Sequence, residues 1–169
     1  MSGELTLAMG RLLTDASLRK TLRQDPEEAS RILNVDAQTL REIDSEALEF
    51  QSQGLIDKRF HEAAKRLPRT LAGLVGGGGP VFREYAASRW PEGHDRHLQD
   101  CAGFVGFLES RGLPLCRAER NRVLFASGSS RIAFRWAPDV WAGGRPRRAI
   151  QILIRIGSTV RSCALYLGL

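Results

Sequence analysis

The chain of 169 residues contains few of the side chains from which catalytic centres are usually built. It has three histidines and three cysteines, and no Ser-His-Asp order, nucleophile elbow or close carboxylate pair. The cysteines, Cys101, Cys116 and Cys163, are odd in number and form no CxxC motif, which argues against a disulfide framework and is typical of a reducing compartment. We therefore expect an accessory protein rather than an independent enzyme, with no catalytic residues and no cofactor.

Long apolar runs are also missing. None approaches the roughly 20 residues that a membrane-spanning helix needs. The chain starts with MSGELTLAMGRLL, which has an acid where a signal peptide has basic residues and shows no clear cleavage site. We therefore expect a cytoplasmic protein that does not use a membrane as a partner.

One pattern is compatible with a metal site. His94 and His97 form an HxxH pair, and Cys101 follows His97 by four residues on an expected helix. Zinc needs three or four protein ligands, and the remaining histidine and cysteines show no ligand spacing. Histidines near a helix start are more often structural, so we expect no metal ion.

Acidic residues are almost absent from the last third of the chain. From Leu115 onward there are ten arginines and only two acids, Glu119 and Asp139, whereas the preceding part has 15 basic and 17 acidic residues. The net charge of +6 therefore comes entirely from the last third. This asymmetry predicts an acidic partner, such as an acidic peptide, an acidic protein face or nucleic acid, although a solvated arginine-rich surface would have the same composition.

The first 113 residues are predicted to be helical, because their apolar residues recur at intervals of three and four. Four aspartates stand where helix N-caps are expected, at Asp15, Asp25, Asp36 and Asp44. The longest expected helix carries one apolar stripe, and Pro68 predicts a break in it near Arg66.

Four consecutive glycines, Gly76 to Gly79, follow this helix and predict a flexible joint. They do not form a phosphate-binding loop, because no strand precedes them and no lysine or Ser/Thr stands in the required place. A short helix bearing Phe82 and Tyr85 is expected after the joint, and another is expected from about residue 95 to Gly112.

In the last third of the chain, apolar residues recur at every second position instead of every third or fourth. Residues 122–126 and 131–137 flank the turn SGSS, isoleucines alternate in RRAIQILIRIG, and the run VRSCALYL ends the chain. These features predict an antiparallel meander of three or four strands that packs on helices. The expected fold class is therefore α+β, with an N-terminal multi-helix region (1–113) followed by a small, basic C-terminal antiparallel β-sheet (114–169).

A small sheet with an open edge can accept an extended peptide as an additional strand. The residues that we expect to bind such a peptide are Arg122, Leu124, Arg131, Ile132, Phe134, Arg135, Trp136 and Arg155. The segment PDVWAGGRP is an alternative occupant of the edge, where Pro138 and Pro146 discourage pairing. The other alternative is a nucleic-acid-binding module, which is disfavoured because no recognition-helix pattern or RRM signature is present.

The helical half resembles a known group of proteins in three segments: LLTDASLRKTLRQDPEEASRILNVD, LIDKRFHEAAKRLPRTLAGL and FREYAASRW…FVGFLESRGL. Its most informative points are Leu12-Leu13-Thr14-Asp15, Lys58-Arg59, Leu67-Pro68, and Phe82 with Tyr85. Over about residues 10 to 113 the pattern is similar to the small partner subunits of multinuclear non-haem iron oxidative enzymes in peptide natural-product (RiPP) biosynthesis, of the MbnC/TglI-like type.

The resemblance implies a non-catalytic partner protein. In such pairs a separate barrel-shaped iron oxidase modifies a precursor peptide, and the partner binds beside the oxidase and helps to hold the leader peptide. The expected partners are therefore an iron-dependent oxidase subunit, in a heterodimer, and a precursor peptide. We expect the helical region to form the partner interface at Lys58, Arg59, Phe82 and Tyr85.

Overall fold

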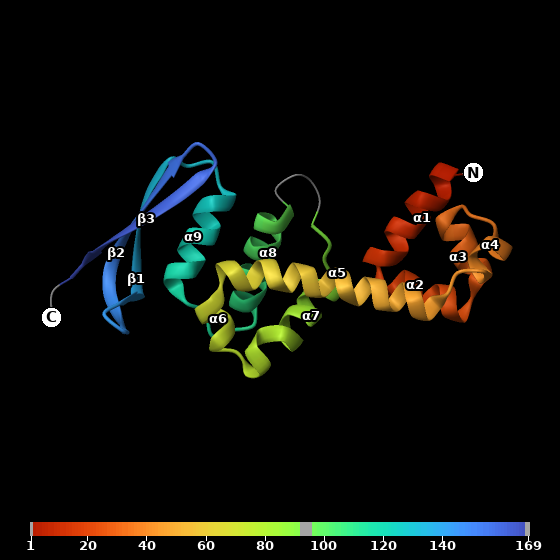
Figure 1. Cartoon of the computed structure of the whole chain (residues 1–169), viewed down its shortest axis with the longest axis horizontal. Helices are drawn as coiled ribbons and strands as arrows, with labels where there is room; N and C mark the ends of the chain where they lie inside the picture. Colours follow the sequence, from red (N-terminus) through yellow and green to blue (C-terminus); the bar gives the residue numbers. More distant parts are fainter. Residues whose placement is uncertain (1, 92–95, 168–169) are drawn as a thin grey trace. The chain divides into compact units, whose positions relative to one another are not determined.

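The computed structural model describes residues 2–91 and 96–167, and it confirms the α+β class (Figure 1). The helices are α1 (Ser2–Thr14), α2 (Ala16–Gln24), α3 (Pro26–Leu33), α4 (Ala37–Arg41), α5 (Ser45–Arg66), α6 (Pro68–Ala72), α7 (Gly79–Ala87), α8 (Arg96–Ser110) and α9 (Arg117–Ser127), with a 3-10 turn at Val75–Gly78. The strands are β1 (Ile132–Ala142), β2 (Arg145–Ile156) and β3 (Thr159–Tyr166).

The described residues form two compact units. The first comprises residues up to Arg59 together with Arg83–Trp90, and the second comprises Phe60–Phe82 and the residues from Pro91 onward. Helices α5 and α7 each contribute to both units. The boundary at residue 113 that the sequence suggests therefore lies inside the second unit.

The caps that the sequence predicts are present in the first unit. Each of the four aspartates accepts hydrogen bonds from backbone N–H groups two or three residues later, at 2.9 to 3.1 Å. These caps set the starts of α2, α3, α4 and α5, whose apolar faces meet that of α1 in one core. The buried residues of this core are Ala8, Leu12, Leu18, Leu22, Ala29, Leu33, Leu40 and Leu48.

The predicted break at Pro68 is confirmed, because α5 ends at Arg66 and α6 begins at Pro68. The N-terminus of α6 has no local side-chain cap. The Glu119 carboxylate of α9 accepts hydrogen bonds there from the N–H groups of Arg69 and Thr70, at 3.0 and 2.9 Å, and from the Thr70 hydroxyl at 2.8 Å. Glu119 is almost completely buried, so these bonds tie α9 to α6 inside the second unit.

The glycine tract forms a tight turn. Gly76, Gly77 and Gly78 have φ values of 61°, 63° and 78°, which glycine adopts without steric cost. Gly78 is buried, and a Cβ added to it would lie 2.5 Å from a terminal methyl of Leu71. The flexibility that the sequence predicts for this tract stays a prediction.

The sheet has the order β1-β2-β3 with both pairs antiparallel. A bulge interrupts the β1–β2 register between Ala137 and Val140, and Gly143 and Gly144, both with positive φ, form the turn of the hairpin. The PDVWAGGRP segment therefore continues β1 and turns into β2. The prediction of a strand at residues 122–126 is wrong, because these residues belong to α9.

Candidate partner-binding surface

Helix α9 packs on one face of the sheet, as Figure 1 shows within the second unit. This face carries small and apolar side chains, among them Ala133, Ala137 and Leu153, which allow the helix to approach closely. Both ends of α9 are bonded to sheet residues. The Asp139 carboxylate accepts hydrogen bonds from the N–H groups of Arg117 and Ala118 at the N-terminus of α9.

Arg155 holds the other end of α9. Its guanidinium donates hydrogen bonds to the carbonyl oxygens of Phe125 and Ala126, at 2.7 and 3.0 Å, and to those of Gly128 and Ser130. An acid at the helix N-terminus and a base at the C-terminus both match the helix dipole. Arg155 was predicted to bind a peptide; the structure shows its Nε and Nη2 groups bonded to carbonyl oxygens of this chain.

The opposite face of the sheet is apolar and open to solvent. Residues of β1 on this face are Ile132, Phe134 and Trp136, whose relative residue exposures are 59%, 62% and 48%. Isoleucines of β2 pair in register with these β1 residues, and Cys163 and Leu165 of β3 pair in register with β2 isoleucines. We call this surface the apolar sheet face; it comprises Ile132, Phe134, Trp136, Ile150, Ile152, Ile154, Ile156, Cys163 and Leu165.

Strand β1 forms an outer edge of the sheet. The Arg155 N–H donates to the Arg131 carbonyl at 2.8 Å, so residues 131, 133 and 135 direct their backbone groups toward β2. The alternate residues Ile132, Phe134 and Trp136 direct theirs outward. The Asn121 side chain of α9 donates to the outward carbonyl of Trp136 at 3.1 Å. The Arg135 side chain donates to the outward carbonyl of Phe134 at 3.3 Å, and because this side chain is exposed, an added strand can displace it and pair with the part of the edge around Ile132 and Phe134.

Arg131 and Arg135 are both exposed and flank this open part of the edge. Arg122 and Leu124, predicted on a strand, lie instead on the exposed side of α9. Arg122 lines a separate pocket of about 360 Å³ with Lys65 and Arg66, whose charges are offset by ion pairs to Glu62 at 2.5 and 3.5 Å. The structure thus places Arg131 and Arg135 on the same strand as the β1 aromatic residues, with Arg155 bonded to Arg131 and with Leu124 lining a pocket of about 300 Å³ beside Arg135. Arg122 lines a different pocket.

The predicted partner interface on the helices needs correction. Phe82 is fully buried between Phe60 and Phe104, with ring centroids 5.5 and 5.0 Å apart, and Tyr85 is also buried. Arg59 is buried too, where it donates to the Arg89 carbonyl at 2.9 Å and stacks on Trp90. The spacing of Phe82 and Tyr85 places them on one face of α7, but that face packs inward. Among the four predicted residues Lys58 is exposed, and the other three are buried.

Comparisons of the chain with family models, curated proteins and solved structures find no match. The functional argument therefore depends on the geometry of the surface. The sequence did not identify several residues of the apolar sheet face as candidates for binding. They are the β2 isoleucines, Cys163 and Leu165, together with Arg148 and Arg161. Alternation along the strands and the register of the sheet place all of them on the same face. The isoleucine alternation was visible in the sequence, but the sequence did not indicate that this face is the uncovered one.

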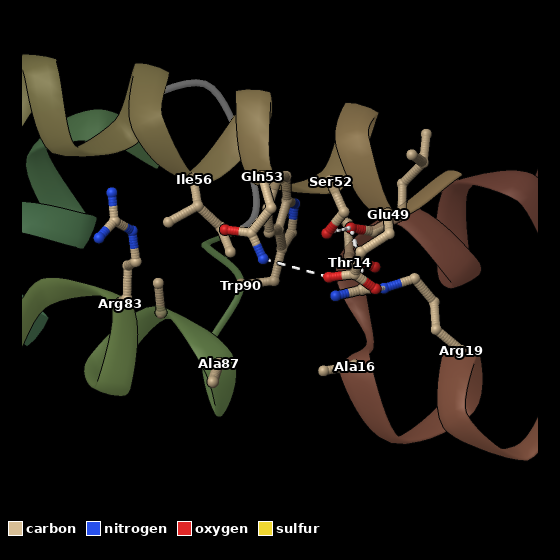
Figure 2. Close-up of a pocket in the computed structure, with 12 residues that line it drawn as sticks. Thr14, Ala16, Arg19, Glu49, Ser52, Gln53, Ile56, Arg83, Ala87 and Trp90 are labelled. Atoms are coloured by element: carbon tan, nitrogen blue, oxygen red, sulfur yellow. Dashed lines mark hydrogen bonds and ion pairs between the residues drawn. The ribbon is translucent and has the colours of Figure 1, made fainter. Parts of the chain in front are cut away.

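A small pocket in the first unit has a structural explanation (Figure 2). It has a volume of about 150 Å³ and is lined by residues of α2, α5 and α7, among others. The buried Arg19 donates to Glu49 at 3.1 Å and to the Leu12 carbonyl at 2.9 Å, while Ser52 donates to the Leu13 carbonyl. Hydrogen bonds from Gln53 and then from Arg19 lower the pKa of Glu49. These polar groups hold the end of α1 against α5.

The remaining candidates for chemistry are cysteines and histidines. Burial raises the pKa of the Cys101 thiol to about 11, and it also raises that of Cys116. His94 lies outside the described residues, and within residues 2–91 and 96–167 no three His, Cys, Asp or Glu side chains gather as metal ligands would. No helix in these same ranges combines the length and the apolar composition needed to cross a bilayer.

Proposed function

We propose that this chain is a non-catalytic, cytoplasmic partner of an iron-dependent peptide-modifying oxidase and that it binds the precursor peptide of that enzyme. The observation that supports the proposal best is the open edge of β1 between the exposed Arg131 and Arg135. Backbone groups directed outward can pair with any extended chain, so they supply affinity without selecting a sequence.

Selectivity in this proposal comes from the two arginines. A leader segment that pairs with the edge around Ile132 and Phe134 places alternate side chains beside Arg131 and Arg135. Carboxylates at those positions form charge-assisted hydrogen bonds, which are stronger than neutral ones. The ten arginines of the last third also raise the rate at which an acidic peptide arrives. Oxidative chemistry is assigned to the separate iron enzyme, as the resemblance of the helical half implies.

Co-expression with the oxidase tests the partner proposal. The two chains are expected to co-elute as one complex on size-exclusion chromatography at micromolar concentration, whereas the chain alone leaves the precursor peptide unmodified. The control is an unrelated iron oxidase of similar size and charge. Two separate peaks for the expected pair, with both proteins folded, would contradict the proposal.

Charge reversal of Arg131 and Arg135 together tests the peptide site. The Arg131→Glu, Arg135→Glu double variant is expected to bind a labelled leader peptide more weakly by roughly 1–3 kcal/mol, because charge-assisted hydrogen bonds are replaced by repulsion. The fold is expected to remain, since both side chains are exposed. Fluorescence anisotropy titration measures the change.

The matched control is Arg145→Glu, Arg147→Glu, which changes the net charge equally at exposed positions near the hairpin turn. Equal weakening in both variants would indicate long-range attraction and remove Arg131 and Arg135 from the site. The nucleic-acid alternative makes a separate prediction: a tight, sequence-selective DNA complex that survives physiological salt would overturn the peptide proposal, because simple phosphate attraction falls steeply with salt.

A further inference from the structure

Peptide binding at the edge of β1 does not account for the exposed apolar sheet face. Ile132, Phe134, Ile156 and Leu165 are each more than half exposed, and Trp136 nearly so. At about 200 Å² for each large side chain, these five present about 600 Å² of contiguous apolar surface to water. Patches of this size are at the upper end for monomeric proteins and usually have a binding role.

The dimensions of the face suit one helix. Three strands about 4.8 Å apart place the outer strands about 10 Å from each other, which is close to the diameter of a helix with its side chains. The isoleucine run from Ile150 to Ile156 extends for about 20 Å, the length of a helix of about 14 residues. On the opposite face the single helix α9 already packs on all three strands. A second helix would complete a three-layer arrangement in which both faces of the sheet are covered.

The charge at the border of the face selects among possible helices. Arg148 and Arg161 lie on this face by alternation and register, and both are exposed. The last third as a whole holds only two acids, and Glu119 and Asp139 are both used in capping helices. A second copy of the sheet would bring like charges together, whereas a helix with carboxylates beside its apolar stripe would pair with them.

We propose that the apolar sheet face is a docking surface for an acidic amphipathic helix of a partner protein. The apolar stripe of that helix packs on the isoleucines, Phe134 and Trp136, and its flanking carboxylates meet Arg148 and Arg161. This inference goes beyond the proposed function, because it concerns the face of the sheet rather than its edge and does not require a leader peptide. It also replaces the helical interface around Phe82, which is buried.

A pair of synthetic helices tests the chemistry directly. One is an amphipathic peptide of about 18 residues with leucine on one side and glutamate on the other, and its partner has lysine in place of each glutamate. With the full chain, the glutamate helix is expected to bind at least about tenfold more tightly than the lysine helix in anisotropy titrations. Equal binding of both helices, or of neither at high micromolar concentration, overturns the proposal.

Substitutions locate the binding. Phe134→Ser with Leu165→Ser is expected to weaken binding of the glutamate helix at least about tenfold, since aromatic and aliphatic anchors dominate such contacts. The matched control Val75→Ser removes another exposed apolar side chain, which lies outside the sheet. Equal affinity in the double variant and the control overturns the proposal. Thermal unfolding confirms that the variants are folded, as expected from the exposure of the replaced side chains.

Cys163 provides an independent readout, because it is exposed in the middle of the face, in register with Ile152. The glutamate helix is expected to slow alkylation of Cys163 severalfold, while the buried Cys101 reacts slowly with or without it. Unchanged Cys163 reactivity in the presence of bound helix overturns the proposal. The proposal is also overturned if the chain alone forms a dimer that Phe134→Ser abolishes. It is overturned likewise if the chain binds anionic phosphatidylserine vesicles and the glutamate helix does not displace them.

Discussion

Replacing Glu119 with alanine is expected to lower the free energy of unfolding by about 3 kcal/mol, because hydrogen bonds to charged groups contribute about 1.5–3 kcal/mol each and are not fully additive. The substitution leaves the N–H groups of Arg69 and Thr70 without their acceptor at the start of α6. Thr70 is buried, so water does not readily replace the carboxylate. Chemical denaturation of the variant and the native protein measures the difference.

Two further variants separate the cap from the charge. Glu119→Gln keeps one acceptor oxygen and is expected to lose about half as much, since one of the paired hydrogen bonds remains possible. Glu109→Ala removes an exposed acid that pairs with Arg120, and it is expected to change the free energy of unfolding by less than about 1 kcal/mol. A Glu119→Ala variant no less stable than Glu109→Ala would show that the buried cap contributes little.

Replacing Gly78 with alanine is expected to lower the free energy of unfolding by about 3 kcal/mol, from left-handed strain and overpacking together. Its φ of 78° disfavours any side chain, and the new Cβ would meet Leu71 at 2.5 Å and Leu74 at 3.2 Å. Both leucines are buried, so their methyl groups have little room to move. The midpoint of denaturant unfolding and its slope give the change.

Two other glycines serve as matched controls. Gly77→Ala has a similar φ of 63° but no atom within 4 Å, so it is expected to cost only the strain, about 1 kcal/mol. Gly54→Ala, inside α5 and also without a close neighbour, is expected to stabilise the protein by about 0.5–1 kcal/mol. Equal losses at Gly77 and Gly78 would show that the leucine contacts are unimportant and that strain alone matters.

Local signals in the sequence were enough to predict the helical half. Asp15, Asp25, Asp36 and Asp44 accept hydrogen bonds from backbone groups only two or three residues away, so their caps depend on nothing distant. The break at Pro68 is equally local, because proline lacks the N–H that a helix interior needs. Period two likewise predicted the sheet, and the turn glycines mark the hairpin between β1 and β2.

The burial of Phe82 and Tyr85 could not be predicted from the sequence. Phe82 and Tyr85 stand at helical spacing, which shows that they share a face but not which way the face points. That direction depends on Phe60 and Phe104, which pack against Phe82 from elsewhere in the chain. An amphipathic pattern on a short helix therefore predicted the grouping of these residues and left their burial undecided.

By itself the sequence determined the fold class, the helix starts and the alternating strands, because each depends on neighbours within a few residues. The tertiary structure decided that residues 122–126 are helical and that α9 covers the Ala133 and Leu153 face of the sheet. Both outcomes depend on Asp139 and Arg155, which bond the two ends of α9 from positions more than 20 residues away. Those bonds hold α9 on one face and leave the isoleucine face open to a partner, which no local pattern in the chain could indicate.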